Sequence, residues 1–174
     1  MRIFYRGFWL VILLAFVLGA CQEKEEPCKC TNIDTSFNFS IVNDANMDLL
    51  NPSNPEHIDI RDVAVSFLLD GERVDVYDSR INHLRSFPKI IEPESLADAD
   101  SYVLNVILNS SEEEALPTTY LEWNNGSVDT LEAEFSFSSN SSIVNRLWLN
   151  GDLIWDMQRD GARPIYSLIK TNGE

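Results

Sequence analysis

The chain has 174 residues, with 28 acidic side chains against 13 basic ones and a formal net charge of −15. This charge argues against nucleic acid as a partner, because proteins bind phosphate backbones through clustered cations. The length suits one domain with a sizeable core, and 7 glycines are too few to suggest a glycine-rich phosphate loop.

The first twenty residues have the pattern of a secretory signal peptide. Arg2 and Arg6 supply a positively charged start, and an apolar run follows from Phe8 to Ala20. A membrane-spanning helix needs about 20 apolar residues, so this run is too short to be one, but it suits the apolar region of a signal peptide. The run ends in Leu18-Gly19-Ala20-Cys21, where two small residues precede a cysteine. We therefore expect residues 1–20 to be cleaved off.

The stretch from Leu18 to Cys21 resembles the lipobox of bacterial lipoproteins. In that family the cysteine thiol receives a diacylglyceryl group, cleavage follows, and the new amino terminus is often acylated as well. The resemblance implies that Cys21 is the site of lipid attachment and that its acyl chains, such as palmitate, hold the protein in a bilayer. Two or more chains give stable anchoring. Without residues 1–20, 11 basic residues remain against 28 acidic ones, a net charge of −17.

Residues 21–34 form the expected lipidated tether. Its acidic tract, Gln22 to Glu26, resembles the signal for surface export in lipoproteins of Bacteroidetes-type bacteria; the alternative is a solvated spacer. The expected location is thus the outer membrane, on the cell surface or on the periplasmic face. Cys28 and Cys30 lack the spacing of a zinc site, so we interpret them as a non-catalytic pair in either redox state.

From Thr35 onward, apolar and polar residues alternate, which is the pattern of β-strands. A β domain is predicted over residues 35–174. About eight strands are expected, and a last apolar run, Pro164 to Ile169, is expected to close an edge. The expected strands are residues 36–42, 63–69, 73–77, 101–109, 118–123, 128–137, 143–149 and 152–157. One helical turn is expected at Pro93–Ala99 and another at Glu112–Leu116, with no long helix.

Short turn sequences connect several of these strands. Asp70-Gly71 and Asn150-Gly151 predict tight hairpins, and Asn125-Gly126 predicts a type I′ turn. We therefore predict an all-β fold, an antiparallel two-sheet sandwich of immunoglobulin-like type. A transthyretin-like sandwich and a small β-barrel are the alternatives, because alternation does not specify strand order.

The whole chain is similar to small β-sandwich lipoproteins of Bacteroidetes-type bacteria that carry no assigned activity. The shared features are the lipobox, a short tether, an early strand followed by the sequence from Asp48 to Pro52, and late strands with Asn-Gly turns. This resemblance implies the location and the fold class, and it implies no mechanism.

The sequence offers little for catalysis. Its two histidines, His57 and His83, lie in predicted loops, and neither H-E-x-x-H nor G-x-S-x-G occurs. Glu56 and Asp59 flank His57 as conceivable metal ligands, but an exposed loop histidine is the simpler interpretation. We predict that the protein is not an enzyme; a small hydrolase is the least favoured alternative.

Loops rich in side-chain oxygens are conceivable calcium ligands, but no cofactor is expected. One candidate cluster comprises Asn43, Asp44, Asn46 and Asp48, and another comprises Asp98 and Asp100. Neither has the spacing of an EF-hand loop, so solvated loop acids are the favoured interpretation.

Two tryptophans, Trp148 and Trp155, flank the Asn150-Gly151 turn and are the candidate ligand platform, although filling of the core or a contact between the sheets is the favoured interpretation. If Leu147 and Leu149 face the core, Trp148 faces outward, and Trp155 lies close by in sequence. Trp123 is expected in the core. We predict a non-enzymatic interaction or structural module of the cell envelope, with an envelope protein as partner. The alternative is a glycan-binding lipoprotein of a polysaccharide uptake system, because sugar rings stack on flat aromatic side chains.

Overall fold

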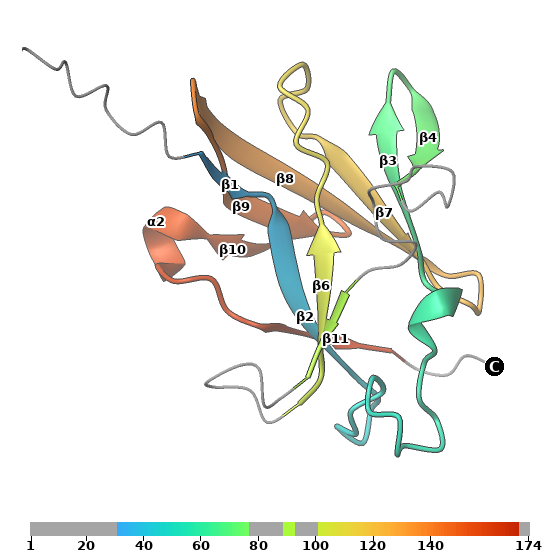
Figure 1. The fold of residues 1–174 in the computed structure, drawn as a ribbon. Helices are drawn as coiled ribbons and strands as arrows, with labels where there is room; N and C mark the ends of the chain where they lie inside the picture. The colour runs from blue at the N-terminus through green and yellow to red at the C-terminus, as the bar shows by residue number, and fades with distance from the viewer. Residues whose placement is uncertain (1–30, 77–88, 93–100, 171–174) are drawn as a thin grey trace, which may run out of the picture. The chain divides into compact units, whose positions relative to one another are not determined.

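The computed structural model describes residues 31–76, 89–92 and 101–170. These residues form an all-β sandwich of two packed sheets (Figure 1). The larger sheet runs in the order β1 (Asn32–Asp34), β9 (Ser141–Leu149), β8 (Val128–Ser138), β7 (Thr118–Glu122), β3 (Ala64–Leu69) and β4 (Glu72–Asp75), and β10 (Asp152–Asp156) pairs with β9. The smaller sheet runs in the order β11 (Tyr166–Ile169), β2 (Ser36–Val42), β6 (Val103–Ile107) and β5 (Lys89–Ile91).

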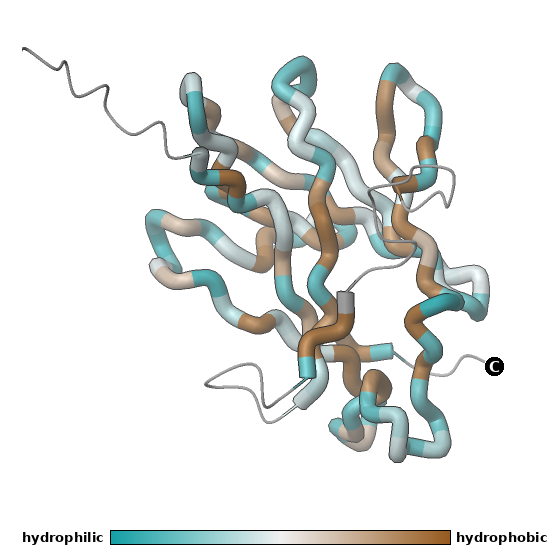
Figure 2. The backbone as a smooth tube through the Cα atoms, viewed as in Figure 1, coloured by the Kyte–Doolittle hydropathy of each residue, from teal (hydrophilic) through white to brown (hydrophobic). Residues whose placement is uncertain are grey.

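Most strands form where the alternation predicts them; the exceptions are β1, which lies in the predicted tether, and β5, which lies in a predicted connection. Phe37, Phe39 and Ile41 in β2 are completely buried, while Asn38 and Ser40 between them are partly exposed. Successive side chains of a strand point to opposite faces, so one face of β2 enters the core. Figure 2 shows apolar stretches along the strands and mostly polar residues in the turns that connect them. The described helices are the short α2 (Met157–Asp160) and the 3₁₀ turn η1 (Ile60–Asp62).

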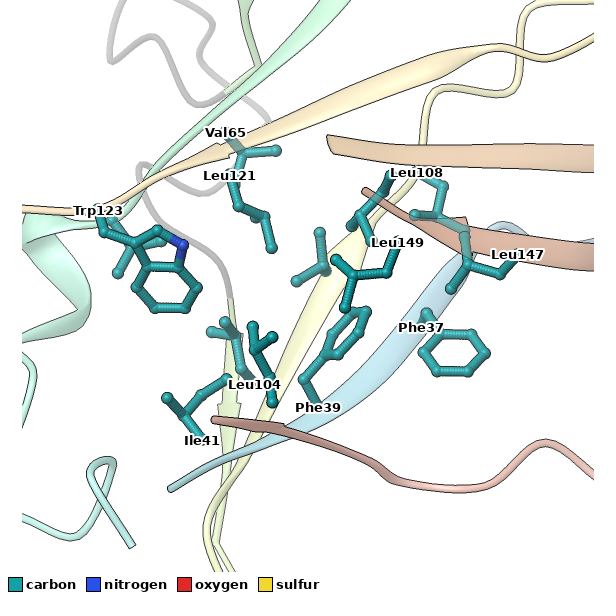
Figure 3. Packing of buried hydrophobic residues seen from close by; sticks show 14 of the residues in the cluster. Phe37, Phe39, Ile41, Val65, Leu104, Leu108, Leu121, Trp123, Leu147 and Leu149 are labelled. Atoms are coloured by element: carbon teal, nitrogen blue, oxygen red, sulfur yellow. The ribbon is translucent and has the colours of Figure 1, made fainter. Parts of the chain in front are cut away.

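The core lies between the two sheets (Figure 3). The smaller sheet contributes Phe39 and Leu104, and the larger sheet contributes Leu121 and Leu147, each with no exposed surface. Trp123 is 3 % exposed, which confirms its predicted core position. This burial removes apolar surface from water and is the main favourable term in the stability of the fold.

The two-residue hairpins are confirmed, and one predicted turn type is wrong. Asp70 and Gly71 have φ values of 52° and 82°, and Asn150 and Gly151 have 53° and 87°, as type I′ turns require. In the β7–β8 hairpin, Gly126 has a positive φ but Asn125 does not. The Gly126 N–H donates to the carbonyl of Trp123, 2.8 Å away. This hairpin therefore has a turn ended by a left-handed glycine, the geometry of a G1 bulge, in place of the predicted type I′ turn.

The sandwich differs from a purely antiparallel one at two edges. β1 pairs with β9 in parallel, and β11 pairs with β2 in parallel. The sheets do not close on each other, so the barrel alternative is wrong. β1 lies before residue 35, the predicted start of the domain. Residues 112–116 form bends rather than a helical turn, and residues 93–99 lie outside the described part.

The burial of the inward face decreases along the last half of β8. Leu131 and Ala133 are buried, but Phe135 is half-buried and Phe137 is 37 % exposed. A bulge interrupts the register of β8 with β9 between Glu134 and Phe135. The core ends near this bulge, while the strand continues to Ser138.

Candidate functional site: the outer face of the larger sheet

The outer face of the larger sheet carries Trp148. Leu147 and Leu149 are 0 % and 8 % exposed, so Trp148 between them points away from the core and is half-buried. Glu132 of β8 and Leu153 of β10 pair with Trp148 from either side. Glu132, Trp148 and Leu153 thus form one row across three strands, here called the Trp148 row. Leu153 is 38 % exposed, so the row ends in an accessible apolar side chain.

Trp155 does not belong to this face, so the structure contradicts a shared platform of Trp148 and Trp155. It is 1 % exposed, and its ring lies 6.0 Å from that of Phe37 in the core. The cause is a bulge in β10 between Leu153 and Trp155. Leu153 pairs with Trp148, but after the bulge Trp155 pairs with Leu147, an inward residue. One extra residue thus turns Trp155 to the opposite face.

A second aromatic side chain lies on the outer face. Tyr120 of β7 is partly exposed and pairs with Thr130, two residues before Glu132 on β8. The guanidinium carbon of Arg73 in β4 lies 3.8 Å from the centroid of the Tyr120 ring. A cation over an aromatic face is attracted by the electrons of the ring. This contact gives Arg73 a defined place on the outer face.

Next to the Trp148 row, Arg146 is held by two acids. Its Nε donates to Asp156 over 2.8 Å and its Nη1 donates to Glu134 over 3.0 Å. The hydrogen bond from Arg146 lowers the pKa of Asp156, and the same contact raises the pKa of Arg146. Asp156 also accepts hydrogen bonds from the backbone N–H groups of Gln158 and Arg159 and so caps α2. These groups are fixed in their charged forms, which suits recognition better than proton transfer.

The other candidate residues are engaged in loop structure or lie elsewhere. His57 is exposed, and its Nδ1 lies 3.1 Å from the carbonyl of Asn54. Asn43 accepts from two backbone N–H groups, and Asp48 accepts from those of Leu50 and Tyr102. Within the described ranges, no group of three His, Cys, Asp or Glu side chains is placed to hold a metal. The predicted sites that fall outside those ranges are Cys21, Cys28, Cys30, His83, Asp98 and Asp100.

Sequence reasoning missed a buried polar cluster around Asp129. The carboxylate, whose side chain is 9 % exposed, accepts from Trp123 Nε1 over 2.7 Å and from Asn150 Nδ2 over 2.9 Å. It also forms an ion pair with Lys170, whose ammonium lies 4.6 Å from the Trp123 ring. Burial alone would raise the pKa of Asp129, but the bonds from Asn150, Lys170 and Trp123 lower it. The alternation was a signal, because Asp129 lies in phase with the inward residues of β8.

The chain was compared with protein-family models, with curated proteins and with solved structures, and none of them matches. Among the described residues, no helix has both the length and the apolar character needed to cross a bilayer.

Proposed function

We propose that this protein is a lipid-anchored, non-enzymatic binding module of a bacterial cell envelope that presents the outer face of its larger sheet to a partner protein. The observation that carries the proposal is the Trp148 row, where a half-buried indole lies between a carboxylate and an exposed leucine. Aromatic side chains with an apolar body and a polar group are enriched at protein interfaces. The resemblance of Leu18–Cys21 to a lipobox supports the membrane anchor.

The fixed charges around this row support binding rather than catalysis. Arg146 is engaged by two acids, and Arg73 lies over Tyr120. A catalytic site needs a nucleophile or a metal with a base within reach. The outer face offers paired charges and aromatic rings, and these provide shape and charge complementarity.

Photo-crosslinking in the native envelope tests this proposal. A photoreactive phenylalanine analogue at position 148 of the full-length protein is expected to give one discrete adduct with an envelope protein. The matched control is the same analogue at Ile169, which is 61 % exposed on the edge strand β11 of the smaller sheet. Adducts of equal yield from both positions, or none from position 148, would contradict a partner on the outer face.

Glycan binding is the second candidate, and the partly exposed Trp148 ring next to Glu132 favours it. An indole face stacks on the C–H face of a sugar, and a carboxylate accepts hydrogen bonds from its hydroxyl groups. If the ligand is a glycan, the anchored protein in detergent binds a defined set of polysaccharides on an array, and Trp148→Ala abolishes that binding. Ile169→Ala serves as the control and should leave it intact. Binding that survives Trp148→Ala would refute this candidate.

A further inference from the structure

The β8–β9 hairpin projects beyond its neighbour β7. β7 begins at Thr118, which pairs with Glu132, whereas β8 continues to Ser138. On the other side of the hairpin, the first described strand, β1, pairs with residues 141–143 of β9. Figure 1 shows β1 beside β9 at this end of the larger sheet. The end of the hairpin and β1 therefore form one structural unit.

Apolar side chains cross this unit in a row. Phe137 of β8 pairs with Ser142 of β9, and Ile33 of β1 pairs with the same Ser142. Phe137 is 37 % exposed and Ile33 is 68 % exposed. Phe135, two residues before Phe137 on the same face, stacks on it with ring centroids 5.7 Å apart. We call Ile33, Phe135 and Phe137 the apolar tip; it continues the core face of the larger sheet into solvent.

The end of the β8–β9 hairpin, which carries Phe135 and Phe137, has no charged side chain of its own, in contrast to the rest of the chain. Residues 135–145 contain no charged side chain, although the chain carries a net charge of −15. The one acid of β1, Asp34, accepts hydrogen bonds from both terminal nitrogens of Arg163, over 2.7 Å and 2.9 Å. A neutral, partly aromatic surface can approach lipid headgroups without the repulsion that an acidic surface meets at an anionic bilayer.

The position of β1 limits how far this unit can lie from the lipid anchor. Nine residues, 22–30, separate Cys21 from Thr31. A fully extended chain spans at most about 3.6 Å per residue, so the start of the sandwich lies within about 36 Å of the anchor. Because β1 pairs with β9, the apolar tip includes Ile33 of the first described strand, which follows residues 22–30 closely in the chain.

We infer that the apolar tip rests on the headgroup layer of the bilayer to which Cys21 is anchored. The inference rests on the proposed lipid anchor and adds a defined orientation. The contact is apolar rather than electrostatic, because Ile33, Phe135 and Phe137 form it, and the acids Glu112–Glu114 belong to the loop between β6 and β7 rather than to this unit. The apolar tip fits an electrically neutral lipid layer. The acyl chains and the apolar tip thus both contact the same membrane, and two membrane contacts anchor a protein more stably than one.

Fluorescence quenching in vesicles tests this orientation with the full-length acylated protein. In a Cys28→Ser, Cys30→Ser background, Ser139→Cys at the end of the hairpin is labelled with a polarity-sensitive dye, and the protein is reconstituted in phosphatidylcholine vesicles. The control label is at Asn125→Cys, beyond the opposite end of β8. We expect blue-shifted emission and strong quenching by headgroup nitroxide lipids at position 139, and water-like emission without quenching at position 125.

The double variant Ile33→Ser, Phe137→Ser should lose most of the quenching at position 139 while the protein still floats with the vesicles. Floating protein with no quenching at position 139, or with equal quenching at both positions, would overturn the orientation and leave the anchor in place. Energy transfer between labels at position 139 of two molecules, without quenching by lipid, would assign the tip to a second copy and also overturn it. Protein that does not float would refute the anchor itself.

Discussion

The Asp129 carboxylate joins three segments that are far apart in the chain. Trp123 follows β7, Asn150 lies in the β9–β10 turn, and Lys170 follows β11 of the smaller sheet. The backbone N–H of Lys170 also donates to the carbonyl of Val42, 2.8 Å away. The cluster therefore connects the two sheets through a buried charge pair, and removing one member of such a pair leaves the other charge without compensation.

Asp129→Ala is expected to lower the free energy of unfolding by about 3–5 kcal/mol near neutral pH. The folded-state pKa of Asp129 is lowered, so its contribution is present above the ordinary aspartate pKa of about 3.9 and is lost as the pH falls below that value. Urea unfolding of wild type and variant should therefore show a difference that narrows on acidification.

Arg61→Ala is the matched control for this prediction. It removes an ion pair with Asp59 in which the Arg61 side chain is 70 % exposed, and exposed pairs contribute about 0–1 kcal/mol. If Asp129→Ala lowers the free energy of unfolding by no more than Arg61→Ala does, the buried cluster is not a stabilising connection between the sheets.

At the scale of elements, turns and bulges determine which face each side chain occupies. The β9–β10 turn holds Asn150 and Gly151 at positive φ, and Asn150 Oδ1 also accepts from the backbone N–H of Thr130 over 2.9 Å. A few residues later, the bulge in β10 turns Trp155 into the core. The β9–β10 turn thus sets the register that pairs Leu153 with Trp148, and the bulge after Leu153 excludes Trp155 from the Trp148 row.

Gly151→Ala is expected to lower the free energy of unfolding by about 1–2 kcal/mol, the cost of a left-handed conformation for a residue with a Cβ. No atom lies within 4 Å of where that Cβ would be, so the loss comes from backbone strain rather than from a clash. Gly151→Asn should lower the free energy of unfolding by less than Gly151→Ala, because asparagine tolerates the left-handed conformation. Thermal unfolding of both variants measures the difference. Equal losses for Ala and Asn would show that backbone conformation at this turn is not the cause.

The sequence predicts the inward and outward faces of single strands, but it does not predict bulges or the pairing of distant strands. Alternation within one strand locates β2, β6 and the inward Leu131, because it reports the local pleat of the chain. It also predicts that Trp148 faces outward. Alternation does not show that Trp155 faces opposite to Leu153, because a bulge between them changes the phase by one residue. It also cannot reveal the parallel pairings of β1 and β11, which join residues far apart in the chain.

At the scale of the whole molecule, the proposed role depends on anchoring at one cysteine. Cys21→Ser is expected to abolish incorporation of radiolabelled palmitate and to leave a precursor that retains residues 1–20, because the thiol is the atom that accepts lipid in the resembled family. The labelling is read on a gel, and cleavage is read from the mass of the purified protein. Cys28→Ser is the matched control and should be labelled like wild type. Palmitate incorporation into the Cys21→Ser protein would contradict the assignment.

The parallel pairing of β11 with β2 has a consequence for biogenesis. Arg163, just before β11, contacts Asp34 across a sequence separation of 129 residues. Contacts of this range form only after most of the chain has been synthesised, and they slow folding because a long loop must close first. An emerging polypeptide therefore cannot complete its smaller sheet early, and β2 keeps one unsatisfied edge until the late segments arrive. If the chain is exported as proposed, such delayed closure would keep it unfolded enough to pass through a translocation pore.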